Sequence, residues 1–304
     1  MQIFIPLPPG YRSADVLAFH GRDREGVAEQ VTQDRVAQDR VAQNRVRKGV
    51  LMGGVAVLLD VTLTPGMARC EVQADGVAAG ALLAMVEEAL HNILGLRIDP
   101  APFLALARDD ALLGAAARRN AGLRIVQSAT IFEALTWAII GQQINLPFAI
   151  ALRRSFILQA GRQHSSGLWC YPEAADVARL APEALTSRKF SRAKADTLLR
   201  LAHLVAGGEL TLARLDDPAQ VTRALLAVKG IGPWTANYAL LRGYGYADCS
   251  LHGDVAIRSA FQRLLHEDTK PGIARTEALL ERYRPHRTMA AACLWASLHQ
   301  PEDN

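Results

Sequence analysis

The spacing of apolar and polar residues separates the first hundred residues from the rest of the chain. Alternating apolar and polar positions predict a strand at Gln2–Leu7, because successive side chains of a strand point to opposite faces, and two further strands are predicted at Val50–Leu63 and Ala68–Ala74. The turn sequence Thr64-Pro65-Gly66 joins the last two strands. We therefore expect a small antiparallel sheet within residues 1–102. Helices are expected in the same part at Ser13–Phe19 and Ala79–Leu94.

From about Pro102 onward, apolar residues recur at helical spacing and the predicted connections are short. This pattern is typical of helical proteins. The chain is therefore expected to belong to the α+β class, with the sheet and its helices followed by an all-helical part over residues 103–304. The predicted helices are Phe103–Arg119, Ala129–Ile140, Pro147–Ala160, Ala174–Leu180, Arg192–Ala206, Pro218–Lys229, Pro233–Arg242, Val255–Leu265, Arg275–Tyr283 and Met289–Leu298.

A five-residue repeat interrupts the first part at about residues 31–46. Variants of Ala-Gln-Asp-Arg separate its repeated valines, which are Val31, Val36, Val41 and Val46. A period of five matches neither the 3.6-residue period of a helix nor the two-residue period of a strand, so neither element would gain a continuous apolar side. We expect an exposed, loop-like expansion. A weaker alternative is that three of its residues contact DNA, namely Arg35, Arg40 and Arg45.

Composition narrows the class of protein only slightly. Of the 304 residues, 50% are hydrophobic and 21% are charged, which allows a substantial core and excludes a disordered chain. The net charge of +4 permits a nucleic-acid partner without requiring one. No basic leader opens the chain and no apolar run approaches the ~20 residues of a membrane helix, so we expect a cytoplasmic protein without membrane contact. The cysteines lack the spacing of zinc or iron–sulfur ligands and are expected to be reduced thiols: Cys70, Cys170, Cys249 and Cys293.

The segment 217–242 combines two predicted helices with a glycine turn. Asp217 and Pro218 open the first helix as N-cap and first residue, and Pro233 opens the second. Between them lies Gly230-Ile231-Gly232, whose glycines place backbone N–H groups beside a helix N-terminus. Such groups suit an anion, and they would hold a DNA phosphate without reading the base sequence. An ordinary tight turn is the alternative, and only the flanking residues favour the DNA-binding interpretation.

The flanking residues supply candidate chemistry. Trp234 and Tyr238 are four residues apart and share one face of the second helix. Asp254 directly precedes the amphipathic helix predicted at Val255–Leu265, a position where aspartate commonly acts as an N-cap. A helix N-terminus also favours the ionised carboxylate that cleavage of a glycosidic bond would require. Core packing of the two aromatic residues and simple capping by Asp254 are the alternatives.

The stretch from Leu225 to Asp254 resembles the helix-hairpin-helix, Gly/Pro-rich loop and aspartate signature of the base-excision DNA glycosylases. It is most similar to the 3-methyladenine-DNA glycosylase II family. The resemblance implies a helix-hairpin-helix glycosylase fold with two helical lobes, at about 129–246 and at 103–119 plus 247–304. The matching segments are 230–238, 240–243 and Asp254, with 132–135 and 140–143 upstream, Trp295 downstream, and Leu7-Pro8-Pro9 at the start of the chain.

The resemblance also implies roles for individual residues. Asp254 aligns with the catalytic aspartate of the family, and Gly230–Gly232 with its phosphate clamp, whose carbonyls can also hold a monovalent cation. No other cofactor is implied. The aromatic residues of the base pocket align with Trp234, Tyr238 and Trp295. The other DNA-binding positions are Ile231, Thr235, Gln142 and Gln143, of which Gln143 aligns near the residue that fills the gap left by a flipped base.

The implied activity is hydrolysis of the N-glycosidic bond of alkylated purines, 3-methyladenine and 7-methylguanine, in damaged double-stranded DNA after base flipping. These purines are cationic in DNA, so a pocket of aromatic faces is expected to favour them over neutral lesions. Superfamily members that also nick the backbone carry a lysine nucleophile at the position of Trp234. The resemblance therefore implies a monofunctional enzyme, and we expect a monomer.

Two departures from the family leave the range of lesions open. His252-Gly253-Asp254 stands where close relatives often have Pro-Asp-Asp, and the wedge position is polar rather than apolar. Two alternatives to the implied activity remain. One is a non-catalytic helix-hairpin-helix DNA-binding protein in which Asp254 only caps a helix. The other is a glycosylase for a different damaged base, such as mismatched adenine or oxidised guanine.

Overall fold

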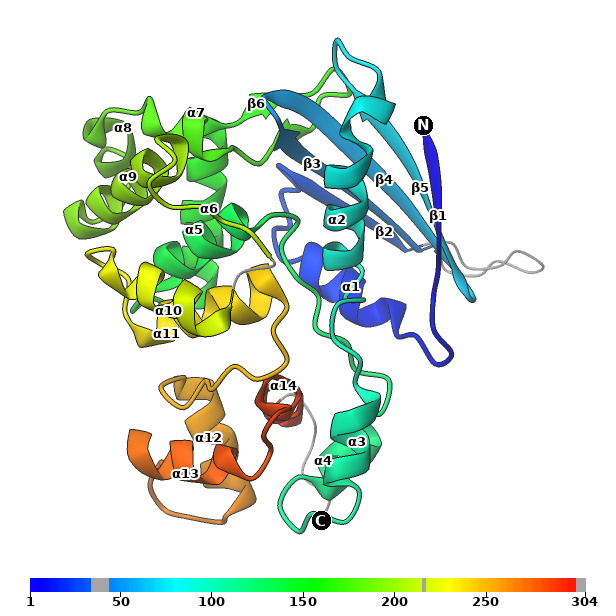
Figure 1. The fold of residues 1–304 in the computed structure, drawn as a ribbon, viewed down its shortest axis with the longest axis vertical. Helices are drawn as coiled ribbons and strands as arrows, with labels where there is room; N and C mark the ends of the chain where they lie inside the picture. Colours follow the sequence, from blue (N-terminus) through cyan, green and yellow to red (C-terminus); the bar gives the residue numbers. More distant parts are fainter. Residues whose placement is uncertain (34–43, 215–216, 299–304) are drawn as a thin grey trace.

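The computed structural model describes residues 1–33, 44–214 and 217–298 (Figure 1). Its N-terminal part is a 5-stranded antiparallel sheet with the strand order β1-β5-β4-β3-β2. The strands are β1 (Gln2–Pro6), β2 (Glu29–Gln33), β3 (Asn44–Met52), β4 (Val55–Thr64) and β5 (Met67–Ala74), and the helices of this part are α1 (Ser13–His20), η1 (Ala79–Leu82) and α2 (Leu83–Ile93). The predicted α+β class, with a small antiparallel sheet followed by helices, is confirmed.

The sheet is covered on both faces near its centre. Val57 and Leu59 of β4 pack in one apolar cluster with Leu17 of α1 and Leu90 of α2. On the opposite face, Leu51 and Ala56 pack against Cys170 of β7 (Trp169–Cys170), which pairs with β6 (Arg162–Gln163). Burial on both faces explains why β4 is apolar almost throughout rather than alternating.

The strand predicted at Val50–Leu63 is wrong, because the chain turns within it. Gly53 and Gly54 have φ angles of 56° and 78°, a left-handed conformation that favours glycine. They join β3 to β4, whose residues pair from Met52–Val55 outward. The apolar residues before and after the two glycines therefore belong to neighbouring strands.

The five-residue repeat also differs from the expectation where it is described. Val31 and Val46 face each other across the antiparallel pair β2–β3, and Val46 is fully buried. Arg45 Nε donates a hydrogen bond to Asp60 Oδ1 at 2.6 Å, so this arginine is held on the sheet by an acidic neighbour. The prediction of an exposed loop is therefore wrong at the two ends of the repeat. The remaining repeat residues, Arg35, Val36, Arg40 and Val41, lie outside the described residues.

The rest of the described chain is mainly helical (Figure 1). None of the helices in the described ranges is long and apolar enough to cross a membrane. The helices are α3 (Ala101–Ala107), α4 (Gly114–Arg119), α5 (Ile131–Gly141), α6 (Leu146–Ala160), α7 (Ala174–Ala178), α8 (Pro182–Thr186), α9 (Arg192–Ala206), α10 (Pro218–Ala227), α11 (Pro233–Ala239), the π-helical turn η2 (Leu240–Tyr244), α12 (Val255–Leu264), α13 (Ile273–Glu281) and α14 (Arg287–Ser297).

One predicted helix, Phe103–Arg119, is divided into α3 and α4. Asp110 lies between them, and its Oδ1 accepts hydrogen bonds from the backbone N–H groups of Leu112 and Leu113 at 3.0 and 2.7 Å. The Tyr283 hydroxyl donates to the same oxygen at 2.8 Å. Local side-chain bonding of this kind competes with a continuous helix and starts a new one.

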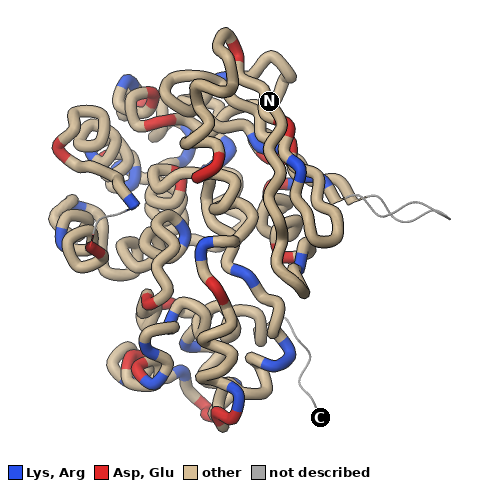
Figure 2. The backbone as a smooth tube through the Cα atoms, turned by 45° about the vertical axis from the view of Figure 1, so that its right-hand side comes forward, with Lys and Arg blue, Asp and Glu red and all other residues tan. Residues whose placement is uncertain are grey.

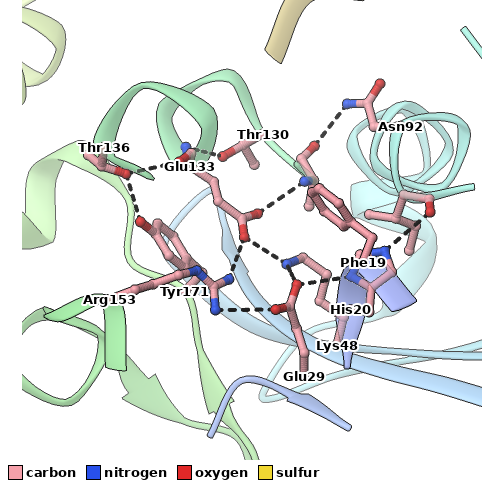
Figure 3. Close-up of polar contacts among 12 residues, drawn as sticks. Phe19, His20, Glu29, Lys48, Asn92, Thr130, Glu133, Thr136, Arg153 and Tyr171 are labelled. Atoms are coloured by element: carbon pink, nitrogen blue, oxygen red, sulfur yellow. Dashed lines mark hydrogen bonds and ion pairs between the residues drawn. The ribbon is translucent and has the colours of Figure 1, made fainter. Parts of the chain in front are cut away.

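A buried group of charged side chains joins the sheet to the helices (Figure 3). Lys48 Nζ contacts Glu29 Oε1 at 2.6 Å and Glu133 Oε1 at 2.8 Å, and Arg153 contacts the same two carboxylates at 3.2 and 2.7 Å. His20 Nδ1 lies 3.0 Å from Glu29 Oε1. Burial alone would raise the carboxyl pKa values, but Lys48 and Arg153 hold those of Glu29 and Glu133 below their usual range. This charge cluster fixes α5, whose C-terminal end leads into Gln142 and Gln143.

Candidate active site

The glycine hairpin of residues 228–232 joins α10 to α11, and its two glycines meet different demands. Gly230 has a φ of 100°, and a Cβ atom there would lie 2.0 Å from Thr197 Oγ1 on α9. Only glycine fits that position. Gly232 is the N-cap of α11 with a φ of −100°, and no atom lies within 4 Å of the Cβ position. The hairpin thus packs on one side and is open on the other.

The predicted DNA-binding residues differ in how exposed they are and in whether their polar groups are already bonded within the protein. Ile231 is buried and its N–H donates to Val228 O at 3.0 Å, so that N–H is already used within the hairpin. Thr235 is buried as well. Gln142 Nε2 donates to Gly230 O at 3.0 Å and to Thr235 Oγ1 at 2.9 Å, which ties the end of α5 to the hairpin. Gln143 alone among these side chains is exposed, and its φ of 54° is unusual for a residue with a side chain.

Asp254 is the N-cap of α12, and its carboxylate has a second set of partners. Oδ1 accepts hydrogen bonds from the N–H groups of Ala256 and Ile257 at 2.9 and 3.0 Å, as the helix start predicts. The same oxygen accepts from Trp295 Nε1 at 3.2 Å, and Oδ2 accepts from Trp234 Nε1 at 3.0 Å. Two indole groups from α11 and α14 therefore converge on one carboxylate. These four donors are all neutral, so they orient the charge of Asp254 without cancelling it.

The predicted base-pocket aromatics lie around this carboxylate, with further residues that the sequence did not reveal. Trp234 and Tyr238 stack with their ring centroids 5.3 Å apart at an interplanar angle of 32°. Trp137 of α5 donates from Nε1 to the Tyr238 hydroxyl at 2.9 Å. In the sequence, Trp137 is one apolar residue of a buried helix, and no spacing rule separates it from a core residue.

Phe19 and two arginines lie against these aromatic residues. The guanidinium carbon of Arg22 lies over the Phe19 ring at 3.8 Å and over the Trp137 ring at 5.0 Å. That of Arg242 lies over the Phe19 ring at 5.0 Å and over the Trp295 ring at 5.5 Å. Phe19 follows α1 residues that pack under the sheet, so the N-terminal part contributes to the site directly.

A cavity adjoins this group. Its volume is about 430 Å³, and its lining includes Phe19, Trp295 and Arg242 together with Arg12 and Arg124. The volume falls within the range of about 300–1,000 Å³ found for small-molecule sites. Aromatic and arginine side chains thus line the cavity together, and one of its lining residues, Trp295, donates a hydrogen bond to Asp254.

Comparisons with known proteins show the family and the fold to which this chain is similar. A family model described as HhH-GPD superfamily base excision DNA repair protein matches residues 136–285. A DNA-3-methyladenine glycosylase of Bacillus subtilis is 31% identical over 215 residues, which are 69% of this chain and 71% of that protein. DNA-3-methyladenine glycosylase 2 of Escherichia coli is 29% identical over 187 residues, or 60% of this chain and 63% of that protein.

Solved structures show the same fold. A 3-methyladenine DNA-glycosylase from Archaeoglobus fulgidus has a TM-score of 0.78 at 20% identity, covering 96% of this chain and 97% of its own. A Schizosaccharomyces pombe 3-methyladenine DNA glycosylase, solved in complex with abasic DNA, has a TM-score of 0.58 at 21% identity and covers 65% of this chain and 96% of its own. From the match to the Bacillus subtilis relative together with the family model, the chain belongs to the HhH-GPD superfamily of base excision DNA repair proteins.

Proposed function

We propose that this protein is a monofunctional DNA glycosylase that hydrolyses the N-glycosidic bond of alkylated purines, 3-methyladenine and 7-methylguanine, in duplex DNA. The observation that carries the proposal is the Asp254 carboxylate, which accepts hydrogen bonds from the indole groups of both Trp234 and Trp295. A helix cap needs only the backbone donors. The additional tryptophan donors hold both carboxylate oxygens in a fixed orientation beside the aromatic residues.

DNA binding is proposed to rest on the hairpin rather than on a broad basic surface. Lys and Arg are spread over many elements of the chain (Figure 2), which matches its modest net charge of +4. The open side of Gly232 lies at the N-terminus of α11, where backbone N–H groups can hold one phosphate. The fold shared with a glycosylase solved on abasic DNA supports the same interpretation.

A base inside the duplex is out of reach, so the target must be flipped out before it is cleaved. Gln143 is exposed beside the hairpin in a backbone conformation that few non-glycine residues adopt. We assign it the place vacated by the flipped base. Gln142 supports it by bonding to the hairpin carbonyl of Gly230.

Chemistry is assigned to Asp254. As the glycosidic bond breaks, positive charge develops on the sugar, and a fixed carboxylate stabilises that charge and can orient the attacking water. Trp234 has no nucleophile to offer the sugar, so no Schiff base with the DNA forms there. The product is then a free base and an unbroken strand with an abasic site.

The hairpin carbonyl oxygens could also serve as ligands for a monovalent cation. Gly230 O and Lys229 O accept bonds from Gln142 and from Arg200 Nη1 at 3.0 and 3.1 Å, and each carbonyl oxygen keeps a second lone pair. Such a cation would add positive charge near the bound phosphate. The roles of Asp254 and the aromatic residues do not depend on it.

The experiment that tests the proposal is base release from methylated duplex DNA by the purified protein, with the released bases separated by chromatography. We expect 3-methyladenine and 7-methylguanine among the products and strands that break only after alkali treatment. Binding without any base release would support a non-catalytic DNA-binding protein. Strand cleavage without alkali would contradict the monofunctional assignment.

A further inference from the structure

Arg22 and Arg242 are half-buried cations, and no acidic group of the described residues forms an ion pair with either. Arg22 Nε donates to the Phe19 carbonyl at 2.6 Å, and Arg242 Nη1 donates to the Val126 carbonyl. Arg242 Nε is buried and, within the described ranges, forms no hydrogen bond. A cation held away from water without a counter-ion is costly to the fold. These two guanidinium groups are therefore candidates for contact with a ligand.

Burial acts on both groups in the same direction. It lowers the pKa of the Arg22 and Arg242 guanidinium groups, while the neighbouring Tyr238 opposes that change in each case. Glu29 also opposes the change at Arg22, whereas Arg153 and Arg242 lower the pKa of Arg22 further. Arginine nevertheless stays charged in proteins, so two positive charges remain close together.

Both arginines lie one aromatic ring away from the proposed chemistry. Arg242 lies over Trp295, whose indole donates to Asp254. Arg22 lies over Trp137, whose indole donates to the Tyr238 hydroxyl in the stack with Trp234. Protein cations thus lie over the ring of Trp295, which is one of the base-pocket aromatics, and over the neighbouring rings of Phe19 and Trp137.

The two arginines beside the aromatic residues affect which bases the pocket favours. A cationic purine entering beside Arg22 and Arg242 meets two like charges, whereas a neutral base with a carbonyl oxygen offers those donors an acceptor. The nearby cavity is lined by Arg12, Arg124 and Arg242. Asp15 is the one acidic residue of its described lining, and it is already paired with Arg12 at 3.1 Å, so positive charge predominates there. Positive potential in a partly enclosed space favours acceptor atoms over positive charge.

We propose that Arg22 and Arg242 are specificity-determining residues of the base pocket, which donate hydrogen bonds to a carbonyl oxygen of the flipped base and shift excision from cationic toward neutral purines. The inference rests on the proposed glycosylase function. It departs from the expectation that cationic purines are favoured simply because the pocket is aromatic.

The test compares 7-methylguanine with hypoxanthine, because both carry a 6-carbonyl and only the former is cationic in DNA. Single-turnover release is measured from otherwise identical duplexes by the wild type, Arg22→Gln and Arg22→Lys. Arg22→Gln removes the charge, and we expect the 7-methylguanine to hypoxanthine rate ratio to rise about 2- to 30-fold, the range of one cation–π interaction. Arg22→Lys keeps the charge, and its ratio should stay close to that of the wild type.

An unchanged ratio in Arg22→Gln, or an equal rise in Arg22→Lys, would overturn the inference. A phosphate contact predicts a different result: weaker binding to every duplex, undamaged DNA included, and a shallower salt dependence by about one charge. Arg242→Gln is measured in parallel, so a failure of either variant to fold does not remove the test.

Affinity measurements test this inference separately from the proposed glycosylase activity. Affinities for 7-methylguanine and hypoxanthine duplexes are measured in the Asp254→Asn background, with and without Arg22→Gln. Absence of base release by the wild type would count against the glycosylase proposal. A duplex affinity ratio that does not respond to Arg22→Gln would count against the arginine role, whatever the chemistry.

Discussion

Two carboxylate sites in this molecule are built from opposite kinds of partner. In the charge cluster, Glu29 and Glu133 are paired with Lys48 and Arg153 at 2.6–3.2 Å. At the start of α12, the described donors to Asp254 are two backbone N–H groups and two indoles. Cations neutralise a carboxylate, whereas neutral donors only orient it.

The difference separates a structural role from a chemical one. The charge cluster joins the sheet to α5 and α6, and its negative charge is already compensated. The charge of Asp254 is left available for positive charge that develops on a substrate. Two arginines of the same region, Arg22 and Arg242, lie over aromatic rings.

The largest expected effect of a substitution concerns the charge cluster. Lys48→Met leaves two buried carboxylates with one remaining cation, and breaking a buried pair in this way costs about 3–5 kcal/mol of unfolding free energy. Chemical unfolding measures the loss. The matched control is Arg275→Met, since Arg275 pairs with Glu267 at the surface and should change stability by no more than about 1 kcal/mol. Equal losses in the two variants would remove the contrast between the sites.

The next effect contrasts the two glycines of the hairpin. Gly230→Ala forces a Cβ atom against Thr197 in a left-handed backbone, which should cost about 1–3 kcal/mol of unfolding free energy. Gly232→Ala has free space and a φ of −100°, so its stability should match the wild type. Thermal unfolding of the two proteins decides the matter, and equal melting temperatures would show that the contact with Thr197 is relieved easily.

A smaller effect is expected when one neutral donor to Asp254 is removed. Trp234→Phe keeps a ring that can stack on Tyr238 but loses the indole N–H bonded to Oδ2. Hydrogen bonds to charged groups contribute about 1.5–3 kcal/mol, and the lower end of that range corresponds to a roughly tenfold slower base release. Unfolding free energy, measured alongside, should change little. A rate equal to that of the wild type would mean that the indole does not orient the carboxylate.

The smallest effect concerns affinity alone. Gly232→Asp places a carboxylate at the open side of the hairpin, where the proposed phosphate binds. Binding should weaken several-fold for damaged and undamaged duplexes alike, because the contact does not read bases. Fluorescence anisotropy at fixed salt measures both affinities. Weakening confined to damaged DNA would place the hairpin in the base pocket instead.

Local sequence patterns predict part of the candidate site. The hairpin glycines and Asp254 before an amphipathic helix are short-range features, and Trp234, two residues after Gly232, donates a hydrogen bond to Asp254. Trp295 was identified only through the family resemblance, since it lies 41 residues from Asp254 in the chain. Its neighbours Arg22 and Phe19 reach the group from the N-terminal part, and no local pattern predicts such contacts.

The errors in the predicted elements also arise from contacts between residues that lie far apart in the chain. Apolar periodicity marked residues 103–119 as one helix, but the bonds of Asp110 to nearby N–H groups and to distant Tyr283 divide it. The repeat was expected to be exposed because its period fits no single element. Pairing of β2 with β3 nevertheless buries Val46, since burial in a sheet depends on the neighbouring strand as well as on sequence spacing.

The central claim is that Asp254 acts through its charge and not only as a helix cap. Asparagine caps helices about as well as aspartate, so Asp254→Asn should keep the fold and its affinity for abasic-site DNA. Its single-turnover release of 7-methylguanine should fall by about 10²–10³-fold, the loss typical when a preorganised charge at the transition state is removed. Retention of more than half the wild-type rate, in a protein that still binds abasic DNA, would contradict the account.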